Sequence, residues 1–226
     1  MGLNYKGIIF DLDGTLIKST IDFVKMKQNM IKILEENGIP EGLLTPRQTT
    51  VVIIEKSENI WDENNKPESA RIPVRLKLDV AMNNGELEAI PLVEEIDDSA
   101  DGIRKLKEMG YHLTILTRSH HEYAVEALKK LKIFELFDHI LGRGQTPKPK
   151  PYREALDFTA KLMKMDMKDL LFVGDHHIDY QSADNAGCAF IGVDTGRSGR
   201  DSWDGKTPKV LLKNVGELPD YLLRNM

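Results

Sequence analysis

The stretch Gly7-Ile8-Ile9-Phe10-Asp11-Leu12-Asp13-Gly14-Thr15 decides how the rest of the chain is interpreted. Its apolar residues run directly into Asp11, which is the pattern of a strand buried on both faces that ends in a carboxylate. Asp13 follows two residues later, and Gly14 permits a tight turn. Two carboxylates this close repel each other unless a cation or a proton compensates, so a hard cation such as Mg²⁺ is a natural partner. A strand followed by an ordinary Asp/Gly turn remains the alternative for these residues taken alone.

The composition is that of a globular protein with an acidic balance of charge. The chain has 226 residues, of which 41% are hydrophobic, and its formal net charge is −5. This charge argues against a protein that coats nucleic acid or anionic membrane. No apolar run approaches the roughly 20 residues that span a bilayer, and the N-terminus lacks a signal-peptide pattern, so we expect a cytoplasmic protein. Cys188 is the single cysteine, which excludes an internal disulfide.

Beyond residue 93, short apolar runs alternate with amphipathic segments. Strands are expected over 112–116, 139–142, 170–174, 189–193 and 210–212, with a Gly/Ser/charged loop over 194–208. This alternation predicts an α/β fold, namely a doubly wound, mainly parallel, Rossmann-like sheet. Ligands of such sheets bind beyond the carboxyl ends of the strands. Asp11, Thr117 and Asp175 each fall at that end of their own strand, which favours one shared site.

Residues 17–92 have a different texture and are predicted to form an inserted, mostly helical cap domain, with 1–16 and 93–226 as the core. Apolar residues at helical spacing indicate a helix between Phe23 and Leu34. The β-branched run over 49–54 could be a strand, but Pro46 before it suits the start of a helix, which we favour. We further expect a loop over 59–69, and a helix over 74–82 that closes at the turn signal 83–85.

Ser119 and Glu122 stand at the spacing of a capping box, so a helix is expected to start there. His120 and His121 would then lie exposed in its first turn. His176 and His177 follow a strand and are interpreted as solvated loop residues, because Mg²⁺ prefers oxygen ligands over imidazole.

Four short segments occur in a characteristic order along the chain. They are DLDGT at 11–15, ILTR at 115–118, KPKP at 148–151 and GDHHID at 174–179. Together they resemble the four motifs of the haloacid dehalogenase superfamily, in particular its phosphoglycolate-phosphatase-like branch with a helical cap. Four matches in order, each in its expected strand or helix context, make coincidence a minor alternative. The resemblance covers residues 7–16 and about 95–195, while 17–92 occupy the place of the cap.

The resemblance implies a role for each aspartate. Asp11 would be the nucleophile that forms an aspartyl-phosphate, and Asp13 would be its acid/base partner. Mg²⁺ would be held by a side-chain oxygen of Asp11, the main-chain carbonyl of Asp13, and Asp175. Asp179 would orient Lys148 or a metal-bound water.

The resemblance also implies which residues meet the substrate phosphoryl group. Thr117 would donate a hydrogen bond to it, with help from Arg118 and the amino end of the following helix. Lys148 would balance the charge of the nucleophile and of the phosphoryl group. The four aspartates would place up to four negative charges in one crevice, so both Mg²⁺ and Lys148 are needed before a phosphate dianion can approach. Arg118 stands where many relatives carry a smaller polar residue, so its contacts with substrate are an open expectation.

These inferences predict a Mg²⁺-dependent phosphatase, monomeric or homodimeric, that hydrolyses a small phosphorylated metabolite through an aspartyl-phosphate. Two alternatives stay open, a phosphomutase similar to β-phosphoglucomutase and a non-catalytic protein that binds a phosphorylated ligand. Within the cap, Arg47, Arg71 and Arg75 are candidates for substrate contact, although each could equally lie on a solvated face.

Overall fold

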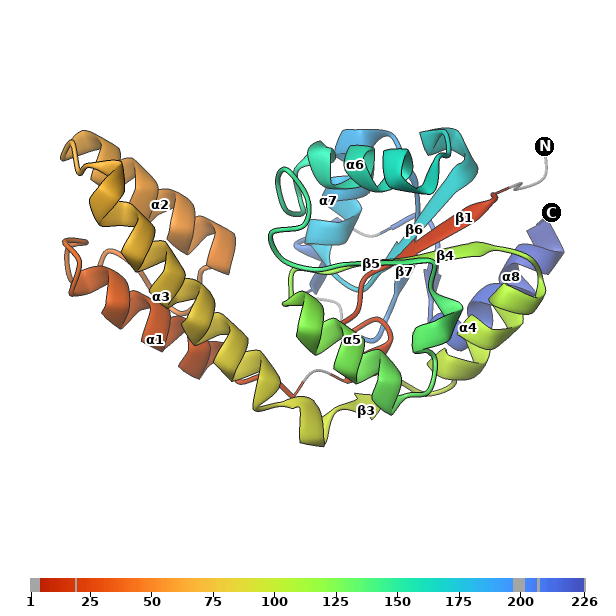
Figure 1. The fold of residues 1–226 in the computed structure, drawn as a ribbon. Helices are drawn as coiled ribbons and strands as arrows, with labels where there is room; N and C mark the ends of the chain where they lie inside the picture. The colour runs from red at the N-terminus through yellow and green to blue at the C-terminus, as the bar shows by residue number, and fades with distance from the viewer. Residues whose placement is uncertain (1–4, 19, 197–201, 207, 226) are drawn as a thin grey trace. The chain divides into compact units, whose positions relative to one another are not determined.

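The computed structural model describes residues 5–18, 20–196, 202–206 and 208–225, so part of the loop expected over 194–208 lies outside the described residues. The chain forms two compact units. The core unit consists of residues 1–19 and 92–226, and the helical unit consists of residues 20–91. Figure 1 colours the chain from its N-terminus to its C-terminus. No helix among the described residues combines the length and the apolar character needed to cross a bilayer.

A six-stranded parallel sheet forms the centre of the core unit, with strand order β5-β4-β1-β6-β7-β8. The strands are β1 (Gly7–Phe10), β4 (His112–Leu116), β5 (His139–Leu141), β6 (Leu170–Gly174), β7 (Ala189–Val193) and β8 (Leu211–Leu212). All four residues of β1 are buried, because β1 lies in the middle of the sheet and both its faces are covered. The predicted α/β fold with a mainly parallel sheet is confirmed.

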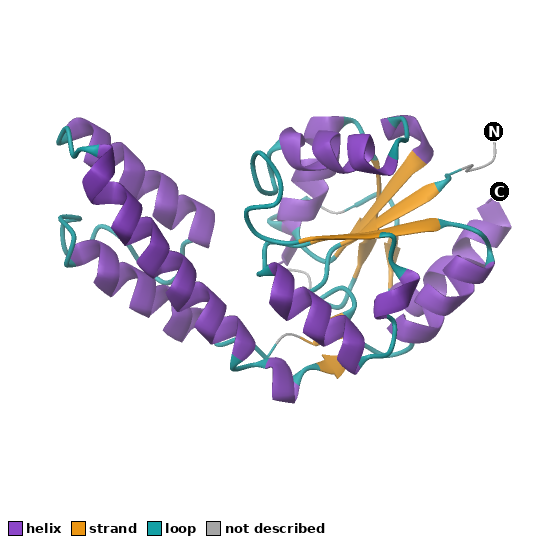
Figure 2. Cartoon of the chain, viewed as in Figure 1, coloured by secondary structure: helices purple, strands orange, loops and turns teal. Residues whose placement is uncertain are grey.

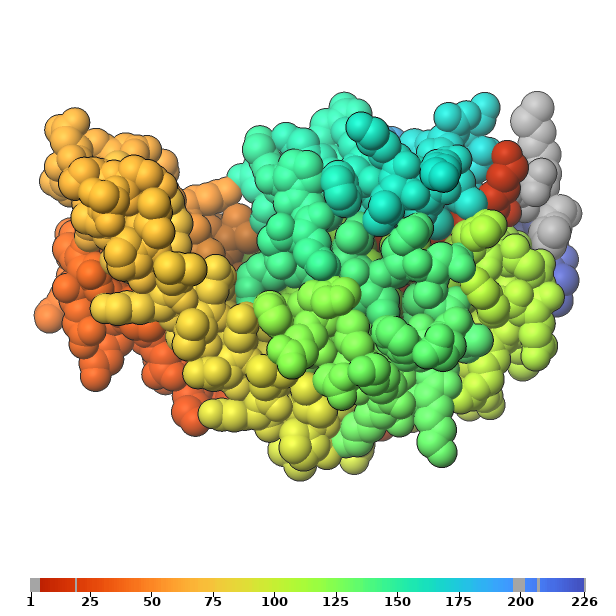
Figure 3. Space-filling model, in the orientation of Figure 1, coloured from red at the N-terminus to blue at the C-terminus, as the bar shows by residue number. Residues whose placement is uncertain are grey.

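Helices cover both faces of this sheet. They are α4 (Ser99–Glu108), α5 (His121–Lys130), α6 (Arg153–Met163), α7 (His177–Ala186) and α8 (Leu218–Asn225). Short 3₁₀ helices lie at Phe134–Leu136, Met167–Asp169 and Val215–Glu217 of the core unit, and another, Ile90–Leu92, lies where the two units join along the chain. Figure 1 shows α6 and α7 on one face, and α4, α5 and α8 on the other. Under α6 and α7, the sheet residues Ile9, Leu116 and Phe172 pack with Leu156 and Ala183 in one apolar cluster. In the space-filling view, side chains fill the spaces between the ribbons within the core unit (Figure 3).

Two short antiparallel strands mark the places where the chain leaves the sheet and returns to it. They are β2 (Ile17–Lys18) and β3 (Glu94–Glu95), paired Ile17 to Glu95 and Lys18 to Glu94. Ser99 donates a hydrogen bond from its hydroxyl to the carbonyl of Leu16 at 2.8 Å, and the Ile96 N–H donates to the same carbonyl at 3.1 Å. The outgoing and returning segments are therefore fastened to each other within the core unit.

The helical unit contains three helices: α1 (Phe23–Glu35), α2 (Thr50–Glu63) and α3 (Glu68–Leu87) (Figure 2). The side chain of Thr49 accepts a hydrogen bond from the Val52 N–H at 3.3 Å and so caps α2. The helix that we favoured over 49–54 is confirmed. The loop expected over 59–69 is largely wrong, since α2 continues to Glu63 and α3 begins at Glu68.

The turn expected at Asn83-Asn84-Gly85 is also wrong, because these residues lie inside α3. Val74, Leu78 and Met82 continue one buried face at a spacing of four residues. The Cα of Gly85 lies close to Met26 of α1, where an added Cβ would sit 3.5 Å from the Met26 side chain. Packing of α3 on α1 therefore outweighs the low helix propensity of glycine and asparagine.

Arg71 and Arg75 both bind carboxylates and join α3 to α2. Arg75 bonds to Glu58 at 2.6 and 2.8 Å, and it also contacts Glu68. Arg71 donates to Asp62 at 2.5 Å. Hydrogen bonding from Arg75 lowers the pKa of Glu58, despite partial burial of that carboxyl. Their substrate contact stays a prediction, as does that of Arg47, which is exposed.

Candidate active site

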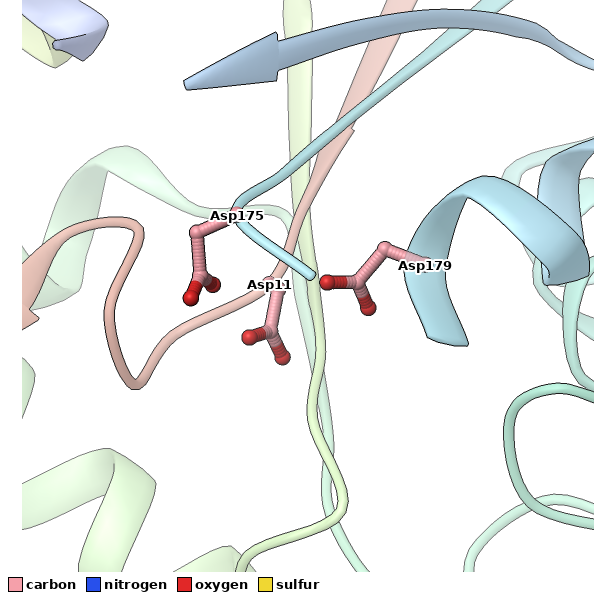
Figure 4. A group of neighbouring side chains, drawn as sticks. All are labelled: Asp11, Asp175 and Asp179. Carbon is pink, nitrogen blue, oxygen red and sulfur yellow. The ribbon is translucent and has the colours of Figure 1, made fainter. Parts of the chain in front are cut away.

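Three buried carboxylates meet at the carboxyl edge of the sheet. Asp11 follows β1, Asp175 follows β6, and Asp179 lies in the first turn of α7. Their candidate ligand oxygens lie within 4.8 Å of one another, and Figure 4 shows the three side chains converging. The register of the sheet explains the pairing, since Phe10 of β1 stands opposite Val173 of β6. The residues that follow these two strands therefore lie next to each other at the carboxyl edge of the sheet.

The turn after Asp11 supports Asp175. Gly14 has φ +84°, a conformation that glycine adopts easily, and a Cβ at this position would collide with the Asp175 carboxylate. Thr15 donates a hydrogen bond from its hydroxyl to Asp175 Oδ1 at 2.9 Å. Thr195 donates to the Gly14 carbonyl at 2.5 Å. Gly14 thus permits the close approach as well as the turn, and sequence analysis missed the role of Thr15 although it stands in the motif.

Lys150, rather than the expected Lys148, reaches the carboxylates. The Lys150 ammonium lies 2.6 Å from Asp11 Oδ1 and 2.7 Å from Asp179 Oδ1, and its side chain is 2% exposed. Lys148 is 54% exposed and pairs with Glu154 at 3.0 Å. The assignment of Lys148 to the site is corrected accordingly. Both lysines lie in an irregular loop, where no periodicity predicts which side chain faces inward, and the Tyr152 N–H donates to the Pro149 carbonyl to turn the chain there.

Burial dominates the electrostatics of the cluster. It raises the pKa of Asp11 to about 6, with Lys150 opposing the shift and Asp179 adding to it. Burial also raises the pKa of Asp175 well above its usual range, and the charge of Asp11 acts in the same direction. For Lys150, burial lowers the pKa, but the two carboxylates outweigh burial and the net shift is upward. The ammonium therefore stays charged.

The donor set fits a hard divalent cation. Three carboxylates and one ammonium leave two negative charges uncompensated in a buried place when all are ionised. Carboxylate oxygens are the ligands that Mg²⁺ prefers. Asp179 is less suited than the other two, because Oδ1 accepts from Lys150 and Oδ2 accepts from the His176 N–H at 3.2 Å. Asp11 and Asp175 are therefore the candidate side-chain ligands.

The Asp13 carboxylate is turned to a different set of partners. Ser119 donates from its hydroxyl to Asp13 Oδ2 at 2.7 Å, and Tyr123 donates to Oδ1 at 2.9 Å. Asp13 is not among the three carboxylates of the cluster, and the binding of metal by its main-chain carbonyl stays a prediction. Sequence analysis missed the contacts of both hydroxyls with Asp13. The capping box expected at Ser119 is wrong, since α5 has His120 at its N-cap and no capping side-chain bond.

Thr117 and Arg118 lie on the other side of β1, because β4 is its neighbour in the sheet. Thr117 is buried, and its hydroxyl oxygen accepts a hydrogen bond from the Ser119 N–H at 3.1 Å. The Arg118 carbonyl accepts from the Arg143 guanidinium at 3.3 Å, and Arg118 is half-buried. Their contact with a phosphoryl group stays a prediction.

His176 helps to start α7 and does not lie in a solvated loop. Its Nδ1 accepts a hydrogen bond from the Ile178 N–H at 3.3 Å, while Asp179 accepts from the His176 N–H. These reciprocal bonds form a capping box that fixes the Asp179 carboxylate toward Lys150. Burial lowers the pKa of His176 to about 4, so its imidazole is neutral. His120 and His121 are half-buried, where exposure was expected.

Comparison with known proteins points to one family. The model of the haloacid dehalogenase-like hydrolases matches residues 8–193. A phosphoglycolate phosphatase of Pseudomonas putida is 27% identical over 218 residues, covering 93% of this chain and 77% of the relative. Pyrophosphatase PpaX of Bacillus mycoides is 24% identical, with 96% of each chain covered. A haloacid dehalogenase-like family hydrolase from Streptococcus pneumoniae has a similar fold, with a TM-score of 0.65 at 19% identity over 96% of this chain and 98% of the other.

Proposed function

The chain belongs to the haloacid dehalogenase-like hydrolase family and is an enzyme of the phosphatase kind, and from this premise we propose that it hydrolyses a small phosphate monoester with Mg²⁺ as cofactor. The reaction would pass through an aspartyl-phosphate on Asp11. The observation that carries this proposal is the position of Asp11, bonded to Lys150 at 2.6 Å and clustered with Asp175 and Asp179. A carboxylate oxygen beside a fixed ammonium suits an attack on phosphorus, because the ammonium stabilises charge on the transferring group.

The residues divide the work as follows. Asp11 attacks phosphorus, and Asp13 gives a proton to the leaving oxygen and later takes one from the attacking water. Lys150 takes the place expected for Lys148, while Asp179 holds Lys150 in position. Asp11 and Asp175, with the carbonyl of Asp13, would hold Mg²⁺, which when bound supplies the positive charge that allows a phosphate dianion to approach. Thr117 and Arg118 remain the proposed contacts for the phosphoryl oxygens.

The substrate class is a small phosphate monoester, such as a phosphoglycolate-like compound or a sugar phosphate. The names of the relatives support this class, and the pyrophosphatase among them adds inorganic pyrophosphate to the compounds worth testing. We also propose that the helical unit contributes to substrate specificity. Hydrolysis is favoured over transfer to a second hydroxyl, because the sequence of residues 17–92 contains no polar cluster clearly suited to holding a sugar in two orientations.

The direct test follows free phosphate released from a panel of small phosphate esters, with Mg²⁺ and after chelation. We expect release only with the metal. The D11N variant keeps nearly the same shape without the anionic nucleophile, so its turnover should fall by roughly three powers of ten or more. Substantial activity of D11N would refute the aspartyl-phosphate route. Interconversion of hexose phosphates with little free phosphate would identify a mutase, and binding without turnover would identify a non-catalytic protein.

A further inference from the structure

The carboxyl group of Asp13 is held by two hydroxyl groups, one on each oxygen. Ser119 donates to Oδ2 at 2.7 Å, and Tyr123 donates to Oδ1 at 2.9 Å. A planar group that is bonded at both oxygens cannot rotate without breaking one of the bonds. The pair therefore fixes the direction in which Asp13 presents its oxygens.

The two hydroxyls are themselves held rigidly by the segment that follows β4. The Ser119 N–H donates to Thr117 Oγ1, and the Ser119 carbonyl accepts from the Arg143 N–H at 2.8 Å. Gly142 makes this approach possible, since a Cβ there would lie 2.9 Å from the Ser119 carbonyl oxygen. Tyr123 is fully buried in the first turn of α5, four residues after Ser119. Both donors thus have fixed positions relative to the sheet that carries Asp11.

Hydroxyl groups suit a carboxyl group that must gain and lose a proton. A carboxylate only accepts hydrogen bonds, whereas a carboxylic acid also donates one. An ammonium group only donates, so it favours the ionised form alone. A hydroxyl can donate or accept after rotation of its O–H bond, and so it can bind both forms.

We propose that Ser119 and Tyr123 are positioning residues that keep Asp13 aligned for both of its proton transfers, an inference that rests on the proposed function. In the first step the bond from Asp11 to phosphorus forms, the bond to the leaving oxygen breaks, and that oxygen takes the Asp13 proton. In the second step water attacks phosphorus, the bond to Asp11 breaks, and Asp13 takes a proton from the water. Ser119 and Tyr123 neither gain nor lose a proton over the cycle.

The test measures kcat/KM for a series of phosphate esters whose leaving groups range from nitrophenols to alcohols. A nitrophenolate leaves without a proton, whereas an alkoxide needs one from Asp13, and general acid catalysis is worth roughly 10²–10⁴-fold. The Y123F variant removes one donor and keeps the buried ring. We expect less than about twofold loss on p-nitrophenyl phosphate and roughly tenfold loss or more on an alkyl phosphate. S119A should show the same pattern, and the double variant should approach D13N.

Y111F is the matched control. It removes a hydroxyl from a buried tyrosine that directly precedes β4, at the opposite end of that strand from Thr117. It should lower kcat/KM equally little for every ester. Equal losses on all esters in both Y123F and S119A, or no loss in either variant, would overturn the inference. The proposed function would still stand in that case, provided that the wild-type protein releases phosphate. Absence of phosphate release by the wild-type protein with Mg²⁺ would instead refute the proposed function itself.

Discussion

Lys150 connects two carboxylates that come from different elements, Asp11 after β1 and Asp179 in α7. The K150M variant would keep an apolar side chain of similar length and remove the ammonium group that contacts both carboxylates. We expect kcat/KM to fall by roughly 10²–10³-fold, because charge on the transferring group loses its fixed ammonium. K148M is the matched control and should change kcat/KM by less than about twofold, since the Lys148 ammonium pairs with Glu154. Steady-state phosphate release measures both, and a larger loss in K148M would return the role to Lys148.

For single residues, the sequence predicts the types of side chain in the site well. It predicts less well which of two similar residues occupies the site. The aspartates could be placed because each follows an apolar run that reads as a strand. The KPKP segment offers two lysines in an irregular loop, and only tertiary burial distinguishes Lys150 from Lys148. Tyr123 gave no local signal, because a tyrosine on the buried face of a helix is equally a core residue until its hydroxyl is seen to meet Asp13.

Between elements, the ion pair of Arg75 with Glu58 holds α3 against α2, and Arg75 also pairs with Glu68 within α3 itself. All three side chains are partly exposed, so solvent screening reduces what these pairs contribute. We expect R75A to lower the free energy of unfolding by about 1 kcal/mol, measured by urea denaturation. The control R104A breaks a single exposed pair with Asp101 on α4 and should cost less than about 0.5 kcal/mol. A changed ratio of activity on alkyl and aryl phosphates in R75A, without loss of stability, would support substrate contact instead.

Element types were largely predictable, and the errors have a common cause. Hydrophobic spacing located the strands of the sheet and the first helix of the insertion. The ends of α2 and α3 were misplaced because Pro67 and the Asn83-Asn84-Gly85 segment are local signals of a break. For the second of these, contact with Met26 of α1 maintains the helix. Such contacts between residues distant in sequence are not visible in a local pattern.

For the whole molecule, the raised carboxyl pKa values link stability to pH and metal. Burial raises the pKa of Asp11 to about 6, above its ordinary value of 3.8. Between these values the folded protein binds more protons than the unfolded chain, so the metal-free protein loses stability as pH rises toward 6. Mg²⁺ binds the ionised form and should raise Tm more at pH 8 than at pH 5. Thermal unfolding with and without Mg²⁺ measures this, D175N should lose the response, and an equal rise at both pH values would contradict it.

The pairing of β2 with β3 brings together the two ends of the chain segment that contains the three helices α1, α2 and α3. Lys18 and Glu94 stand opposite each other in an antiparallel pair, as the two residues next to the tip of a hairpin do. A tight turn could join them as well as a bundle of helices can, and the order of the six parallel strands would be unaltered. Recombination at this strand pair can therefore exchange, enlarge or remove the segment between β2 and β3 during evolution. Under the proposed function, substrate range would then diverge while Asp11 keeps its proposed role as nucleophile.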